Sequence, residues 1–388
     1  MKSNVLKKII YNVKLILDNL NNYKYLKIKK SCGNNGIVLL VHESRRLGAS
    51  ILALNIAKEL VSQGENVYII TKRFGELNSE FAKIAPIQVI WNTTKLKKTL
   101  NYLHNKHNFN KAIANTALMG SYAKIANEEG YKVISLIHEL GPVIQQLHAE
   151  QETKYLLKYS SKVIFSTKIA KNEVLDLLHL KDNKKYLIKP QGVYYTKPSF
   201  NICRKEKNKL LNLYPHLKNN LVISGIGNTT FRKGFDIFLK VADELSEYQF
   251  IWAGKKENRE YIKIMKKRQW KIPSNFTYLG ELTPNQLSGV YSLTDILFLS
   301  SRNDTLPSVI FEAMLFGVPV VGAKSSGGIS DVVDNSCGIL TEKVNSGQFI
   351  RAIKKVATSK RYFDQEKIKE KVSNNSMSNY VKYINSLL

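Results

Sequence analysis

Short apolar runs alternate with amphipathic stretches along most of the chain. The first clear unit begins with the apolar run GIVLLVH at residues 36–42 and closes with NVYIIT at residues 66–71. Between them, an amphipathic stretch has helical spacing and ends at Gly64, a residue suited to the left-handed conformation that terminates many helices. Two apolar strands joined by a helix are typical of a β-α-β unit, the start of a parallel sheet.

The alternation continues in two blocks. Further strands are predicted, with helices between them, at 87–91, 111–116, 132–138 and 162–167 in the first block and at 220–227, 248–254, 275–282 and 295–301 in the second. The segment 186–201 contains two prolines and a glycine and breaks the pattern, so we interpret it as an interdomain linker. Two α/β blocks predict two doubly wound domains that face each other across a cleft, with ligands at the carboxyl ends of the strands.

A basic amphipathic segment, residues 1–32, precedes the first block. Apolar residues recur at helical spacing over residues 4–20, and residues 1–30 contain eight lysines with Asp18 as the single acid. Two interpretations stay open. The apolar stripe packs on the first domain as ordinary core, or the segment lies on an anionic membrane surface as an interfacial helix.

The net charge of the chain is extreme for its size. The 388 residues are 44% hydrophobic, which allows two globular domains, and carry a formal net charge of +28. This charge has three interpretations: a lysine-, asparagine- and isoleucine-rich composition, nucleic-acid binding, or an anionic partner such as a membrane surface or a phosphate-bearing substrate. No zinc-finger spacing or RNA-binding aromatic motif occurs, so nucleic-acid binding rests on charge alone.

The sequence predicts a cytoplasmic protein. It has no stretch of 18 apolar residues without charge, so we predict no transmembrane helix. Lys7, Lys8 and Lys14 interrupt the only apolar run near the N-terminus, and we expect no signal peptide. The three cysteines are far apart and lack metal-ligand spacing, which favours a reducing compartment.

Two carboxylates stand eight residues apart in the stretch SSRNDTLPSVIFEAMLFGVPVVGAKSSGG, residues 300–328. Pro307 is suited to the first turn of a helix and Gly317 to its end, so Asp304 lies in the preceding loop and Glu312 inside the helix. The plain interpretation is that Asp304 caps this helix and Glu312 is solvated. Apolar neighbours surround Glu312, however, and a half-buried carboxylate usually has a partner or a function. The helix start and the SSGG segment are candidate anion sites.

This stretch resembles the signature of the retaining GT-B glycosyltransferases of family 4. That signature has two glutamates eight residues apart within an EAM and PVV segment, followed by a Gly-Gly loop. Here Glu312, in EAMLFGVPVV, is the second glutamate, and Asp304 replaces the first. Lys233 in FRKGFD resembles the family's phosphate-binding lysine. The arginine that usually precedes it is absent, Gly227 stands near its place, and Arg232 is the residue that would compensate.

The first block shares further segments with this family, so the resemblance covers most of the chain. VISLIHE resembles the strand whose histidine lies at the donor sugar, which makes that residue His138, and Glu139 is a candidate to orient its ring. HESRRLGAS resembles the loop in which Gly48 approaches the donor phosphate and the acceptor. His42, at the start of that loop, either lines the cleft or is a structural histidine.

The resemblance also implies a division of the chain. The domain at 33–190 would bind the acceptor, the domain at 193–368 would bind the donor, and IKPQGVY, residues 188–194, resembles the hinge. A C-terminal helix within 369–388 would cross back to the first domain.

Each site residue receives a role from the resemblance. Glu312 would accept hydrogen bonds from the ribose hydroxyls, Asp304 would accept them from the donor sugar, and Lys233 with Arg232 would neutralise the diphosphate leaving group. The catalytic set is His138, Lys233, Asp304 and Glu312. The substrate-binding set is Gly48, Arg232, Lys233, Pro307, Ser308, Val309, Glu312, Gly327 and Gly328. No Asp-x-Asp occurs, so we expect no metal and no cofactor beyond the nucleotide diphosphate sugar donor.

We therefore predict a GT-B, metal-independent, retaining glycosyltransferase of the hexosyltransferase type. It would transfer a sugar from a nucleotide diphosphate sugar to a glycan or lipid-linked acceptor in bacterial surface polysaccharide synthesis, such as lipopolysaccharide or capsule. We expect it to be peripheral on the inner face of the cell membrane, with the anionic membrane surface as a partner and no nucleic acid. Two alternatives stay open: a GT-B protein that binds nucleotide sugars without catalysis, and a basic nucleic-acid-binding protein.

Overall fold

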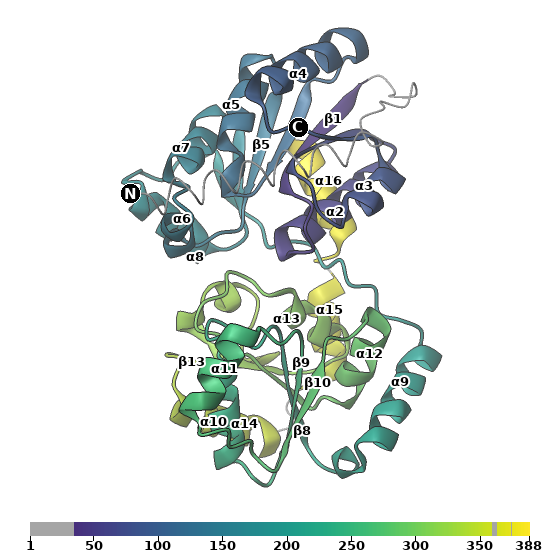
Figure 1. Ribbon diagram of the computed structural model, residues 1–388, viewed down its shortest axis with the longest axis vertical. Helices are drawn as coiled ribbons and strands as arrows, with labels where there is room; N and C mark the ends of the chain where they lie inside the picture. Colours follow the sequence, from purple (N-terminus) through teal and green to yellow (C-terminus); the bar gives the residue numbers. More distant parts are fainter. Residues whose placement is uncertain (1–34, 359–362, 374) are drawn as a thin grey trace. The chain divides into compact units, whose positions relative to one another are not determined.

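The computed structural model describes residues 35–358, 363–373 and 375–388, which form two units (Figure 1). The first unit combines the described residues up to Tyr194 with Met377–Leu388, and the second is Tyr195–Ser376. The amphipathic helix expected at 4–20 and the rest of segment 1–32 lie outside the described residues. No helix in the described part of the chain is both long and apolar enough to cross a membrane.

The first unit is built on a seven-stranded sheet of the order β3-β2-β1-β4-β5-β6-β7, in which every neighbouring pair is parallel. Its central strands are buried on both faces, so they appear in the sequence as continuous apolar runs. The strands are β1 Gly36–Glu43, β2 Asn66–Arg73, β3 Ile87–Val89, β4 Lys111–Asn115, β5 Lys132–Ile137, β6 Lys162–Phe165 and β7 Tyr186–Ile188.

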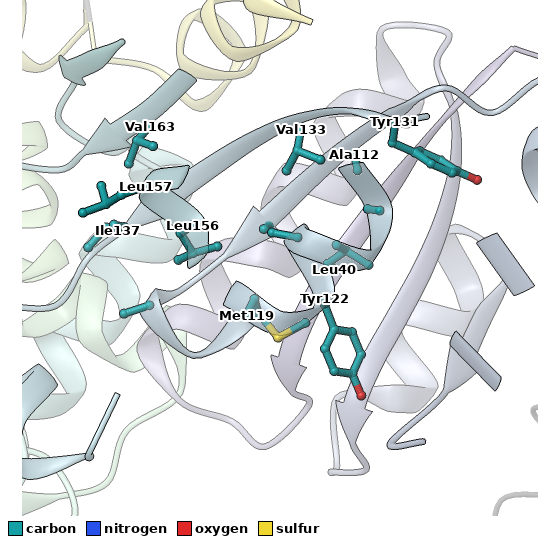
Figure 2. Packing of buried hydrophobic residues seen from close by; sticks show 14 of the residues in the cluster. Leu40, Ala112, Met119, Tyr122, Tyr131, Val133, Ile137, Leu156, Leu157 and Val163 are labelled. Carbon is teal, nitrogen blue, oxygen red and sulfur yellow. The ribbon is translucent and has the colours of Figure 1, made fainter. Parts of the chain in front are cut away.

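Helices cover both faces of this sheet. One face packs on α2 Gly48–Ser62, α3 Asn78–Ile84 and α16 Met377–Leu387; the other packs on α4 Thr93–His107, α5 Gly120–Glu128, α6 Gly141–Gln146, α7 Glu150–Tyr159 and α8 Lys168–Leu177, with a 3₁₀ turn at Ala117–Met119. Figure 2 shows residues of the second of these cores, to which Leu40, Ala112, Met119 and Tyr122 all belong. Buried tyrosine hydroxyls are satisfied there, because Tyr122 donates to the carbonyl of Ile90 at 2.6 Å.

The second unit is built on a six-stranded parallel sheet of the order β10-β9-β8-β11-β12-β13. Its strands are β8 Val222–Ile226, β9 Gln249–Ala253, β10 Phe276–Gly280, β11 Ile296–Phe298, β12 Val320–Ala323 and β13 Gly338–Thr341. One face packs on α10 Phe235–Glu244, α11 Asn258–Lys267 and α14 Ser346–Thr358, and the other on α9 Phe200–Leu213 and α12 Pro284–Leu293. Helix α13 Ser308–Leu315 contacts α15 Gln365–Ser373.

Each sheet has one point at which the strand order reverses, between β1 and β4 in the first unit and between β8 and β11 in the second. From β1 or β8 the chain first adds strands on one side of that strand and later adds the remaining strands on its other side. The loops that follow the two strands at the reversal point therefore lead away in opposite directions. Ligands of doubly wound sheets bind at such a point. The prediction of two doubly wound parallel sheets is confirmed.

The structure corrects two details of the predicted organisation. Tyr186–Ile188 of the predicted linker forms the edge strand β7, and Phe200 begins α9, so the irregular connection is shorter than 186–201. The second unit ends at Ser376 and not at 368, while the helix expected from MSNYVKYINSLL, residues 377–388, is α16 Met377–Leu387. Helix α15 belongs to the second unit, and the return to the first unit begins at Met377.

Candidate active site

The loops after β8 and β11 meet at the reversal point of the second sheet and bring two predicted site residues together. The ammonium group of Lys233 forms an ion pair with the carboxylate of Asp304, although the two residues are 71 positions apart. Both side chains are mostly buried, at 17% and 15% exposure. Arg232 adds a second cation, with its Nη1 3.5 Å from Asp304 Oδ1 and 2.8 Å from the carbonyl oxygen of Asn303.

A glycine fixes the loop that carries these cations. Gly234, which directly follows Lys233 and caps α10, has a φ of +69°. A Cβ at this position would lie 1.9 Å from the carbonyl oxygen of Ser300, two residues after β11. Only glycine allows this conformation and this close approach together, so Gly234 brings the two loops close enough for the ion pair to form.

A third loop, after β12, closes against Asp304. The backbone N–H of Asp304 donates to the carbonyl of Ser326 at 2.7 Å, and that of Gly328 donates to the carbonyl of Thr305 at 2.8 Å. Gly327 has a φ of +136°, and a Cβ there would lie 1.9 Å from the carbonyl oxygen of Asp304. The predicted binding residue Gly327 is therefore packed directly on Asp304, and Gly328 is hydrogen-bonded to the next residue, Thr305.

Glu312 lies in α13 and is 8% exposed. The hydroxyl of Tyr291, in α12, donates to Glu312 Oε2 at 2.7 Å. Burial raises the pKa of Glu312, and hydrogen bonds from Tyr291 and Ser308 act in the opposite direction. The carboxylate that the sequence places in an apolar setting therefore has partners.

The helix around Glu312 starts one residue later than predicted. Pro307 is the N-cap in extended conformation, and Ser308 and Val309 are the first helical residues. Ser308 precedes Glu312 by one turn, which explains why its hydroxyl reaches the carboxylate. Asp304 and Glu312 are thus joined by one short loop and one turn of helix, while the structure gives them different partners.

A neutral network lies at the reversal point of the first sheet. His138, just after β5, has its Nε2 3.0 Å from Asn115 Oδ1 at the end of β4. Asn115 Nδ2 donates to the carbonyl of Ala49 at 2.9 Å, in the first turn of α2. Because the amide oxygen of Asn115 must then accept, His138 Nε2 carries the proton. The predicted residues His138 and Gly48 are therefore linked through Asn115 and Ala49.

Burial keeps the ring of His138 neutral. It lowers the pKa of His138 to about 4, and the other ring nitrogen, Nδ1, is buried without a hydrogen-bond partner among the described residues. Glu139 does not orient this ring. Its carboxylate accepts from the backbone N–H groups of His138 at 3.0 Å and Ala117 at 3.1 Å, and burial raises its pKa.

The end of β1 carries a further buried carboxylate, Glu43. It forms an ion pair with Arg45, and His42 Nδ1 lies 3.7 Å from its carboxylate. Burial alone would raise the pKa of Glu43, but the hydrogen bonds and charges of His42 and Arg45 outweigh it and lower the pKa to about 2. In the same loop region, a Cβ added at Gly48 would meet no neighbouring atom within 4 Å, so packing within the unit does not require a glycine there.

Sequence reasoning missed Asn115 and Tyr291. Asn115 had a detectable signal, since it is a polar residue at the carboxyl end of an apolar strand that pairs with β1. Tyr291 had none, because an aromatic residue in an amphipathic helix is typical of ordinary core. Its ring does stack on Phe316, with centroids 5.4 Å apart, and only its hydroxyl serves Glu312.

Most of the second unit matches the model of a known protein family. Residues 209–377 match the family glycosyl transferases group 1. The match covers less than half of the chain. The match contains Lys233, Asp304, Glu312 and the Gly327–Gly328 pair, the residues that meet at the reversal point or pack around it.

Two curated relatives match parts of the chain. The alpha-galactosylglucosyldiacylglycerol synthase of Streptococcus pneumoniae is 30% identical over 109 residues, which are 26% of this chain and 28% of that protein. The processive diacylglycerol alpha-glucosyltransferase of Acholeplasma laidlawii is 26% identical over 164 residues, or 42% of this chain and 45% of that protein. The chain thus spans less than half the length of these relatives.

A solved structure matches nearly the whole chain in fold. Anabaena HepE, in complex with UDP and glucose, superposes with a TM-score of 0.74 at 17% identity, covering 92% of this chain and 100% of HepE. At this identity the likeness concerns the fold. The two parallel-sheet α/β units have the architecture of GT-B glycosyltransferases, as predicted.

Proposed function

We propose that the chain is a retaining glycosyltransferase of family 4 and hexosyltransferase type. It transfers a sugar from a nucleotide diphosphate sugar to a glycan or lipid-linked acceptor. The observation that carries this proposal is the Lys233–Asp304 ion pair with Arg232 at the reversal point of the second sheet, inside a segment of the glycosyl transferases group 1 family.

The charges of this cluster fit a diphosphate. In the ligand-free chain, Asp304 neutralises Lys233. A bound diphosphate takes over Lys233 and Arg232, because phosphate oxygens form strong charge-assisted hydrogen bonds with both cations. Asp304 is then free to accept hydrogen bonds from hydroxyls of the donor sugar. The two cations stabilise the charge that develops on the leaving diphosphate, which is the reason to propose a metal-independent reaction.

Glu312 fits the nucleoside side of the donor. A carboxylate offers about four acceptor positions, so the hydrogen bonds from Tyr291 and Ser308 leave room for ribose hydroxyls. UDP is the first nucleotide to test, since the HepE structure contains UDP.

The acceptor side rests on charge and on relatives. The two curated relatives are named for sugar transfer to diacylglycerol or its glycosides, which favours a lipid-linked acceptor for this chain as well. The formal charge of +28 favours an anionic membrane surface as a partner. We place the protein in the cytoplasm, peripheral on the inner face of the membrane, and in bacterial surface polysaccharide or glycolipid synthesis.

The test compares two lysines of the same segment. Lys233→Ala removes the proposed diphosphate contact and is expected to cost on the order of 2–5 kcal/mol of transition-state stabilisation, as for other buried charge pairs. Lys240→Ala, at an exposed position of α10, is the matched control and should leave turnover unchanged. UDP at a hundred times its dissociation constant should stabilise the parent by roughly 2.7 kcal/mol in thermal unfolding, and stabilise Lys233→Ala less.

Three results would change the proposal. UDP stabilisation without sugar transfer from any nucleotide sugar in a panel would leave a binding protein without catalysis. Normal turnover in Lys233→Ala would make the ion pair purely structural. An inverted anomeric configuration in the product, read by NMR, would contradict the retaining mechanism and the assignment to family 4.

A further inference from the structure

Helix α11 presents an exposed face of cations around an apolar side chain. Its inner face buries Ile264 and Met265 in the core of the second unit. The opposite face carries residues at spacings of three and four, which lie together on a helix. We call this face, with two exposed side chains that follow the helix, the α11 surface: Arg259, Ile262, Lys263, Lys266, Trp270 and Ile272.

The cations of the α11 surface are not neutralised by the chain itself. In the described part of the chain, Arg259, Lys263 and Lys266 form no ion pair, whereas Arg268 on the inner side pairs with Asp243 at 2.6 Å. Glu260, the one acid within α11, accepts instead from the backbone N–H of Phe231 at 2.7 Å. The outward face is therefore positive and available to an anionic partner.

Three large apolar side chains accompany these cations. Ile262 is 42% exposed, Trp270 56% and Ile272 54%. Trp270 is held in an unusual backbone conformation, since Gln269 and Trp270 have φ values of +52° and +60°. A bulky aromatic residue rarely adopts the left-handed region. The turn is fixed by the N–H of Trp270, which donates to the carbonyl of Met265 at 2.8 Å, and it leaves the indole at the surface.

We propose that the α11 surface is a docking site for an anionic lipid bilayer. Cations bind the phosphate-bearing headgroups, while Ile262, Trp270 and Ile272 enter the boundary between headgroups and acyl chains, as in interfacial helices. A nucleic acid fits less well, because Ile262 and Ile272 offer no stacking platform for bases and Trp270 is the single aromatic residue of the α11 surface. The inference rests on the proposed function, which includes a lipid-linked acceptor. It deepens that function by assigning a membrane contact to the unit that would bind the donor.

The first experiment measures vesicle binding of the full chain. Co-sedimentation uses vesicles of phosphatidylcholine alone and of phosphatidylcholine with phosphatidylglycerol, at low and high salt. The triple variant Arg259→Gln, Lys263→Gln, Lys266→Gln removes the cations of the α11 surface. The matched control replaces Lys205, Lys209 and Lys218 by Gln, which are exposed positions in and after α9 on the opposite face of the same sheet.

The parent should bind the phosphatidylglycerol vesicles and lose binding in high salt. The α11 triple variant should lower the partition coefficient by at least about tenfold, since each lysine near an anionic surface contributes about 1 kcal/mol. The control should lower it by less than about threefold. Equal losses in both variants, or no binding by the parent, overturn the proposal, because binding would then be diffuse or absent. The parent and both triple variants contain residues 1–34, so any contribution of this segment to vesicle binding is the same in all three proteins.

The second experiment tests whether Trp270 enters the bilayer. Trp91→Phe leaves two tryptophans, of which Trp252 is 2% exposed and inaccessible to lipid. In this background, brominated lipids should quench emission, and adding Trp270→Phe should abolish the quenching. No quenching, or binding of a DNA duplex that the α11 triple variant loses to the same extent as vesicle binding, overturns the membrane assignment. UDP stabilisation of the triple variant should equal that of the parent, so failure here is separate from failure of the proposed function.

Discussion

The two reversal points have the same sheet topology and differ in the polar groups that gather there. In the second unit, the mostly buried ion pair of Lys233 and Asp304 meets the more exposed cation of Arg232. In the first unit, a neutral chain of hydrogen bonds runs from His138 through Asn115 to Ala49, and the Glu43–Arg45 ion pair lies at the end of β1. An ionic cluster exchanges partners with a charged ligand, whereas a neutral network orders uncharged hydroxyl groups. The fold therefore provides the position, and the loop residues determine which polar groups each unit presents there.

The largest expected effect concerns the glycines at the two edges. Gly234→Ala places a Cβ 1.9 Å from the carbonyl oxygen of Ser300 at a φ of +69°. Left-handed strain and overpacking together should destabilise the second unit by about 3 kcal/mol. Gly48→Ala meets no atom within 4 Å and should leave the thermal unfolding of the first unit unchanged while slowing sugar transfer. If Gly48→Ala turned over like the parent, no ligand would approach the chain there.

The folding stability of the first unit should depend on pH through His138, in the neutral hydrogen-bond chain with Asn115. The folded-state pKa of His138 is about 4, below its ordinary value of 6.5. Between these values the unfolded chain binds a proton that the folded chain does not, so stability is complete above pH 6.5 and is lost as the pH falls towards 4. The loss amounts to at most about 3 kcal/mol. Unfolding of the parent and of His138→Gln across this pH range measures the stability loss that His138 causes. The comparison also separates this loss from the effect of Glu139, whose raised pKa makes stability fall as the pH rises.

The control for this pH effect is His148→Asn. His148 is exposed and has a φ of +51°, a conformation that asparagine tolerates. This variant should keep the pH dependence of the parent. A parallel pH profile for His138→Gln and the parent would show that the ring is protonated normally and the network is not neutral.

The two carboxylates of the second unit should separate by function. Asp304→Ala should lower turnover by about a hundredfold, roughly 2.7 kcal/mol, while UDP binding persists, because Asp304 is released to the sugar only when the diphosphate is bound. Glu312→Ala should weaken UDP binding itself. Calorimetry with UDP and initial rates with a nucleotide sugar measure the two quantities. Equal losses of binding and turnover in both variants would mean that they act as one unit.

The smallest expected effect concerns Tyr291. Tyr291→Phe removes the hydroxyl that donates to Glu312 at 2.7 Å and should weaken UDP binding by about 1–2 kcal/mol, the cost of one hydrogen bond to a buried charged group. Tyr278→Phe is the matched control, since its hydroxyl donates to the carbonyl of Gly254 at 2.7 Å and does not contact Glu312. Similar UDP affinities in the two variants would show that Tyr291 serves stability only.

The sequence predicted the strands well because the central strands are buried on both faces. Runs such as 36–42 and 132–138 are therefore continuously apolar and stand out from the amphipathic helices. The sequence also singled out Asp304 and Glu312, through the proline and glycine that bound the predicted helix, and Lys233, through the resemblance of FRKGFD to the family 4 segment. The side chains that contact these residues could not be predicted from the sequence. Tyr291 reaches Glu312 from another helix, and that contact depends on how α12 packs against α13.

Boundaries were the second weakness of the sequence. The short strand β7 contains only three residues and has a lysine and a proline directly after it, so its pattern matches that of a linker. The division between α15 and α16 depends on which core each helix joins: Ile368 and Val372 are buried in the second unit, and Tyr380, Val381 and Ile384 in the first. Amphipathic periodicity alone does not choose between two cores.

The return of α16 to the first unit makes that unit discontinuous in the chain. Tyr380, Val381 and Ile384 fill one of its two cores, and the N–H of Met377 donates to the carbonyl of Val193 at 3.2 Å, so the two connecting segments enter and leave the second unit together. During translation, the second unit is complete before α16 emerges from the ribosome. The first unit must therefore keep an apolar surface beside α2 uncovered until α16 has been made.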